Sequence, residues 1–232
     1  MSVWTMRENW GIEGSLTTDE HRKPGECIST YYFSEVLGEL LSDEDVLTTG
    51  GSGLGIEIFL LSVPLLPHRD VICSWSLGPM GGGPPTAIGA CIGSGRKQTI
   101  CIGGDGGFQL NIQELETIQR LNRPIKFFIL CNDGYASMRV SQMRWFGRSF
   151  GADESSGLTL PPLDKIADTY GFQWFRLVGT EDLGVQIKQI LAFDGPVICE
   201  VPSPPNEIRP PAPVNKSSSW TPTPKFRVDA PK

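Results

Sequence analysis

The sequence predicts an α/β fold in three layers, with a central, mostly parallel sheet of about six strands between two layers of helices. Six short apolar runs, rich in Val, Ile and Phe, have the length and composition of strands that are buried on both faces. Helix patterns lie between several of these runs, and strand–helix–strand alternation makes neighbouring strands parallel. Glycine-rich loops between residues 50 and 107 follow the runs, at the strand ends where such sheets bind ligands.

The strands and helices are expected in a definite order. The strands are expected at 45–49, 71–75, 98–103, 125–131, 173–178 and 196–201. Helices are expected at 33–41, after Asn111, at 164–170 and at 181–192. For the second helix, Asn111 is the expected N-cap, with Glu114 completing a capping box. Its apolar stripe consists of Ile112, Leu115, Ile118 and Leu121.

The 232 residues fit one domain of ordinary size with flanking segments. Residues 1–30 are polar and irregular, and residues 31–202 hold the predicted strands and helices. Residues 203–232 are rich in Pro and Ser and poor in apolar residues, which predicts an extended or disordered arm.

Composition excludes several classes of function. A net charge of −6 with no basic face argues against nucleic acid and against anionic membranes as partners. No stretch reaches the ~20 apolar residues of a membrane span, and the N-terminus lacks the apolar core of a signal peptide. The six cysteines are scattered without a CxxC pair. These features predict free thiols and a cytoplasmic location.

A glycine-rich loop with one acidic residue follows the third predicted strand. Residues 98–107 read QTICIGGDGG, and Asp105 lies between two pairs of glycines. Glycines let backbone N–H groups approach an anion, and a carboxylate fits there if a divalent cation bridges it to a phosphate. Asn132 ends the next strand, 27 residues later, and Gly134 follows it. Their oxygens are expected beside Asp105, because adjacent parallel strands end at the same edge of the sheet.

Two other interpretations of this loop are open at this point. One is a tight turn, with Asn132 acting only as a helix cap. The other is a dinucleotide-binding loop, although residues 103–108 read GGDGGF rather than GxGxxG. No acidic residue ends the next strand in the ribose-binding manner, and Asp133 comes closest.

Two segments then resemble a known family. Residues 104–139, GDGGFQLNIQELETIQRLNRPIKFFILCNDGYASMR, resemble the thiamine diphosphate motif of acetolactate synthase-like enzymes. Residues 76–90, SLGPMGGGPPTAIGA, resemble the segment of the same family that holds the two rings of the cofactor. The resemblance covers about residues 30 to 202 and corresponds to the family's C-terminal, diphosphate-binding domain. It implies thiamine diphosphate and Mg²⁺ as cofactors.

The resemblance also implies a role for each matching residue. Asp105, Asn132 and the Gly134 carbonyl are the implied magnesium ligands. Met80 is the implied apolar wedge that bends the cofactor, and the Gly78 carbonyl accepts a hydrogen bond from the pyrimidine amino group; both are therefore candidate catalytic residues. The remaining cofactor contacts are Ser52, Gly53, Gly106, Gly107, Tyr135, Ala136 and Ser137.

In this family a glutamate from a separate pyrimidine-binding domain activates the cofactor. The glutamates at 35, 39, 44 and 57 read as solvated side chains, so the activating glutamate is expected from a partner pyrimidine-binding subunit. The expected protein is one subunit of a split enzyme and forms a hetero-oligomer, such as a heterotetramer. It decarboxylates a pyruvate-like 2-oxo acid and joins the remaining fragment to a second carbonyl. A simple 2-oxo acid decarboxylase subunit and a non-catalytic cofactor-binding or regulatory subunit are the alternatives.

Overall fold

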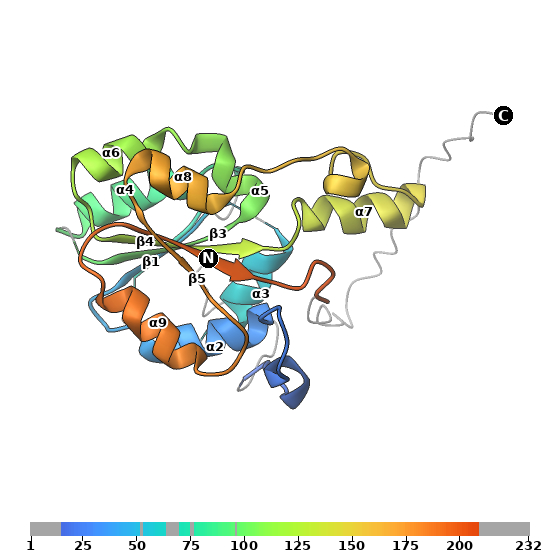
Figure 1. Ribbon diagram of the computed structural model, residues 1–232, viewed down its shortest axis with the longest axis horizontal. Helices are drawn as coiled ribbons and strands as arrows, with labels where there is room; N and C mark the ends of the chain where they lie inside the picture. The colour runs from blue at the N-terminus through green and yellow to red at the C-terminus, as the bar shows by residue number, and fades with distance from the viewer. Residues whose placement is uncertain (1–14, 52, 64–69, 75–76, 96, 209–232) are drawn as a thin grey trace, which may run out of the picture.

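A computed structural model of the chain describes residues 15–51, 53–63, 70–74, 77–95 and 97–208, and it has the predicted three layers (Figure 1). One six-stranded sheet has the strand order β2-β1-β3-β4-β6-β5, and every pairing is parallel. The strands are β1 Val46–Thr49, β2 Val71–Ile72, β3 Thr99–Gly104, β4 Ile125–Cys131, β5 Gln173–Arg176 and β6 Val197–Pro202. The predicted fold class is confirmed, and a strand lies in each of the six predicted regions.

Helices cover both faces of the sheet (Figure 1). One face carries α2 Thr30–Leu40, α3 Leu54–Ser62 and α9 Leu183–Ala192. The other face carries α4 Gly83–Gly93, α6 Glu114–Arg120 and α8 Leu163–Tyr170. Successive side chains of a strand point to opposite faces. Phe127 and Phe128 of β4 accordingly belong to two different core clusters, one on each side of the sheet.

The remaining helices lie outside these two layers or are very short. They are α5 Asp105–Phe108 and α7 Ala136–Phe146, together with the 3-10 helices η1 Asp19–Arg22, η2 Gln109–Asn111 and η3 Glu154–Ser156. In Figure 1, α7 projects away from the sheet beyond the carboxyl end of β4. After β6 the chain returns to α2, where the Glu207 carboxylate accepts a hydrogen bond from the Thr30 N–H at 3.0 Å. The domain boundary at residue 202 stays a prediction.

Two details of the sequence prediction are wrong. Burial on both faces does not hold for β2 and β5, whose residues are exposed or half-buried because these strands form the two edges of the sheet. Asn111 does not cap α6, which starts at Glu114 after a 3-10 turn. The Asn111 amide instead donates to the Gly81 carbonyl at 2.9 Å, which ties the start of this helical region to the loop before α4.

Helices α3, α4 and α7 carry no amphipathic pattern that would have predicted them. Helix α3 is apolar on almost every side, with Ile56, Ile58 and Phe59 all buried. Helix α4 opens with Gly-Pro-Pro, and α7 exposes apolar side chains such as Trp145 and Phe146. Among the helices of the described residues, none has the length and apolarity that crossing a membrane requires.

Candidate functional site

The loops after β1, β3 and β4 meet at one edge of the sheet. Gly104, the last residue of β3, pairs with Leu130 of β4, so the next residues of both strands lie side by side. Asp105 starts α5 directly after β3, and Asn132 follows the last residue of β4. The predicted juxtaposition of these two side chains therefore follows from the register of two central strands.

The Asp105 carboxylate is held by backbone donors from both loops. Its Oδ1 accepts from the Gly106 N–H at 2.7 Å, and its Oδ2 accepts from the N–H groups of Asn132 and Gly134, both at 3.1 Å. Burial nevertheless raises the pKa of this carboxyl to about 6, and the charge of Asp133 acts in the same direction. A cation beside Asp105 would reverse this effect, because an opposite charge favours the ionised form.

The side chain of Asn132 supplies the test of whether a metal fits here. Asn132 is 9% exposed, and its Oδ1 is buried without a hydrogen-bond partner. Leaving a buried polar atom unsatisfied costs about 1–3 kcal/mol, so such an atom calls for a ligand. A carboxylate and an amide oxygen are hard donors of the kind that Mg²⁺ prefers. The residues present therefore fit a magnesium ion bound between Asp105 and Asn132.

Three helices begin around a cavity of about 200 Å³ next to these residues. The first residues of α3, α5 and α7 contribute to its wall, and none of the three helices has a side-chain N-cap hydrogen bond. A helix N-terminus presents unsatisfied N–H groups and a partial positive charge. The Gly106 N–H of the four-residue α5 already donates to Asp105, so the starts of α3 and α7 are the helix ends that favour an anion in this cavity.

Most of the predicted cofactor residues line this cavity. Those in its wall are Gly53, Met80, Gly106, Gly107, Asn132, Gly134, Tyr135, Ala136 and Ser137. Asp105 and Gly78 are not part of the lining. The Asp105 carboxylate is hydrogen-bonded to three lining residues, Gly106, Asn132 and Gly134. Ser52 lies outside the described residues. Met80 is 40% exposed, so its side chain is accessible to a ligand or to a neighbouring protein.

Glycine is required where the loops press together. A Cβ on Gly51, whose φ is +110°, would lie 2.8 Å from the Pro79 carbonyl oxygen. A Cβ on Gly106 would lie 2.4 Å from the ring of Tyr135. These close approaches bring the loop after β1 against the Met80 loop, and Tyr135 over the start of α5.

Six further residues of the wall were not predicted from the sequence. They are Gly50, Gly55, Ile56, Gly104, Leu130 and Met138. The three glycines lie in or next to the glycine-rich loops, and this position could have predicted that they line the cavity. The three apolar residues carry no such signal, because core positions have the same composition.

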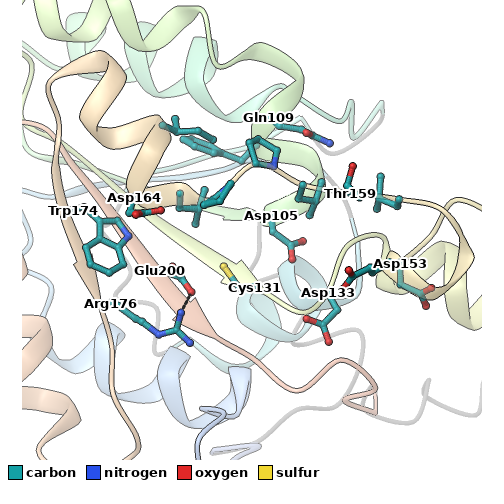
Figure 2. A pocket seen from close by; sticks show the side chains of 18 of the residues that line it. Asp105, Gln109, Cys131, Asp133, Asp153, Thr159, Asp164, Trp174, Arg176 and Glu200 are labelled. Carbon is teal, nitrogen blue, oxygen red and sulfur yellow. Dashed lines mark hydrogen bonds and ion pairs between the residues drawn. The ribbon is translucent and has the colours of Figure 1, made fainter.

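A second and larger cavity, of about 880 Å³, is lined in part by Asp105 (Figure 2). Six carboxylates line it: Asp105, Asp133, Asp153, Glu154, Asp164 and Glu200. Arg176 also lines it, and its guanidinium is paired with Glu200. The excess of negative charge disfavours a diphosphate, so the smaller cavity is the candidate cofactor site.

Comparison with known proteins shows the family to which the chain belongs. Residues 58–201 match the family described as "Thiamine pyrophosphate enzyme, C-terminal TPP binding domain". The chain belongs to this family, and its domain is related to the acetolactate synthases.

Three relatives illustrate the similarity. The acetolactate synthase large subunit of Cyanidium caldarium is 35% identical over 129 residues, which are 56% of this chain and 22% of that protein. Acetolactate synthase 2, chloroplastic, of Nicotiana tabacum is 29% identical over 185 residues, 76% of this chain and 27% of that protein. The mitochondrial acetolactate synthase of Schizosaccharomyces pombe is 31% identical over 180 residues, 77% of this chain and 26% of that protein. The match thus spans about a quarter of each relative's length.

Proposed function

We propose that this chain anchors the diphosphate of thiamine diphosphate through Mg²⁺ and so forms one half of an active site. The observation that carries the proposal is the unpartnered Oδ1 of Asn132 beside the Asp105 carboxylate, next to a cavity where three helices begin. This arrangement offers oxygen ligands to a cation and N–H donors to an anion at adjacent places.

The individual roles extend this proposal to each residue. Asp105, Asn132 and the Gly134 carbonyl hold the metal. Gly53, Gly106, Gly107, Tyr135, Ala136 and Ser137 would contact the diphosphate and the part of the cofactor next to it. When bound, thiamine diphosphate supplies a carbon nucleophile for the decarboxylation of 2-oxo acids and for carbon–carbon bond formation. Met80 would pack against the cofactor as an apolar wedge, and the Gly78 carbonyl would accept a hydrogen bond from its pyrimidine amino group.

We propose that a pyrimidine-binding partner subunit supplies the activating glutamate. No acidic side chain is among the described residues that line the candidate cavity. The cavity volume of about 200 Å³ is also below the ~300–1,000 Å³ of complete ligand sites, as expected for half of a site. The assembled hetero-oligomer would act on a pyruvate-like 2-oxo acid and join the product to a second carbonyl, as the names of the relatives suggest.

The test is reconstitution with a pyrimidine-binding protein from the same organism, sought first in the neighbouring reading frames. Carbon dioxide release from pyruvate and formation of acetolactate are measured with thiamine diphosphate and Mg²⁺. We expect neither product from the purified chain alone and both from the mixture. Robust turnover by the chain alone would contradict the split arrangement. Cofactor binding without turnover in the mixture would favour a non-catalytic subunit.

Magnesium binding is expected to weaken as the pH falls below about 6. Burial raises the pKa of the Asp105 carboxyl to about 6, so below that pH the folded chain holds a proton that the cation has to displace. Well below the pKa, each further pH unit should lower the affinity about tenfold. Calorimetric titration at about pH 5 and about pH 8 would measure this, with the titration of the cofactor itself subtracted. Equal affinities at the two pH values would contradict the assignment of Asp105.

A further inference from the structure

Arg139 is a buried cation and the fourth residue of α7, and none of the roles above uses it. Its residue surface is only 8% exposed. Its Nη2 donates to the Asn132 carbonyl at 2.9 Å, and its Nη1 donates to the Asp133 carbonyl at 3.1 Å. One guanidinium therefore binds two consecutive carbonyls of the loop that carries two of the three proposed metal ligands. We propose that Arg139 is a positioning residue that holds this loop in its metal-binding shape, an inference that rests on the proposed function.

The loop has a backbone that requires such support. Asp133 has a φ of +64° and Gly134 a φ of +107°, so two successive residues lie in the left-handed half of conformational space. A non-glycine residue held there costs on the order of 1–3 kcal/mol and persists only when its surroundings fix it. The two hydrogen bonds from Arg139 fix the peptide groups on both sides of Asp133.

The two oxygens of Asn132 differ in their hydrogen bonding. The Asn132 carbonyl is occupied by Arg139, whereas the Oδ1 of the same residue is buried and has no partner. The main-chain oxygen is thus engaged on the arginine side, and the amide oxygen is left for a cation. Arg139 influences the metal through Asn132 rather than by contact.

Arg139 connects this loop to two further segments. Its Nη2 also donates to the Pro205 carbonyl, beyond β6, and its Nη1 lies 3.7 Å from Asp153 Oδ2. The 152–158 segment in turn contacts the loop of residues 132–135, which is called the metal loop below, because the Tyr135 N–H donates to the Ala152 carbonyl at 2.8 Å. The guanidinium is therefore the common partner of α7, the metal loop, the loop after α7 and the chain after β6.

Only a planar fork can serve these acceptors together. A lysine ammonium keeps the charge but has one compact donor group, so it cannot reproduce the bonds of Nη1 and Nη2. Arg139→Lys therefore separates geometry from charge. Arg144→Ala is a matched control, because Arg144 lies on the same helix, is exposed and stacks on Trp145 at 5.4 Å.

The experiment measures binding by the full chain at a temperature well below its melting point. The probes are thiamine diphosphate with Mg²⁺ and inorganic pyrophosphate with Mg²⁺, followed by calorimetry. Residues that orient metal ligands are worth about 10- to 100-fold in affinity, so we expect a loss of about 10-fold for Arg139→Lys and more for Arg139→Ala. Arg144→Ala should bind like wild type. Millimolar methylguanidinium should restore part of the affinity of Arg139→Ala.

The outcomes distinguish this inference from the proposed function. If wild type binds neither probe, either alone or mixed with the pyrimidine-binding subunit, the proposed function is wrong. If wild type binds and Arg139→Lys binds equally well, the positioning role is wrong, even if the melting temperature of the variant has dropped. An Arg139→Ala variant that folds but stays weak in methylguanidinium would also contradict the role. If Arg139→Ala does not fold, the Arg139→Lys measurement alone decides.

Discussion

Replacing Asp105 with asparagine is expected to lower Mg²⁺-dependent binding of thiamine diphosphate on the order of 1,000-fold, about 4 kcal/mol. The substitution removes the negative charge that would face the cation. It also breaks a set of hydrogen bonds, because the two carboxylate oxygens accept three N–H groups from Gly106, Asn132 and Gly134. An amide can accept with one end only, so a donor on the other side loses its partner.

Asp133→Asn is the control for Asp105→Asn. It removes the same charge from a neighbouring residue that is exposed and has a φ of +64°. Asparagine tolerates that conformation, so the fold should be unaffected. Calorimetric titration with and without Mg²⁺ should show near wild-type binding for Asp133→Asn. Equal losses of affinity in the two variants would mean that the loss reflects the overall negative charge rather than a metal ligand. Unchanged binding in Asp105→Asn would refute the metal site.

The strands of the central sheet could be predicted because short segments of the sequence identify each of them. The run at 125–131 is apolar apart from Lys126 and is bounded by turn residues, and β4 has these same limits. The position of β5 at an edge of the sheet could not be predicted in this way. Trp174 and Phe175 suggest burial, yet both are only half-buried, because the position of a strand in a sheet depends on distant pairing partners. Local composition cannot distinguish an edge strand from a central one.

Some residues of the candidate site could also be predicted from local sequence, and others could not. Asp105 and Asn132 each follow a recognisable strand, so their juxtaposition could be inferred from topology alone. Arg139 could not be found in this way, since its partners include Pro205, 66 residues away, and Asp153 in another loop. The unpartnered oxygen of Asn132 likewise appears only when all neighbouring donors are placed. The candidate ligands can therefore be found from the sequence, whereas the groups that orient them cannot.

Gly134→Ala is expected to destabilise the folded chain by about 4 kcal/mol, because two separate effects add. The φ of +107° is strained for any residue with a Cβ. The added Cβ would also lie 2.6 Å from the Ala152 carbonyl oxygen and 2.7 Å from Leu158 Cδ2. Relief of this overlap would pull the Ala152 carbonyl away from the Tyr135 N–H, which now donates to it at 2.8 Å.

Gly147→Ala isolates the backbone effect from the steric one. Gly147 ends α7 with a φ of +66°, and a Cβ there would meet nothing within 4 Å. The free energy of unfolding of Gly147→Ala should therefore fall by about 1 kcal/mol, the usual penalty for a Cβ in the left-handed conformation at a helix end. Urea denaturation of both variants gives the comparison, read from the midpoints at unchanged slope. A Gly134→Ala variant no less stable than Gly147→Ala would mean that the loop after α7 yields freely, and that the metal loop is not fixed by its contact with Ala152.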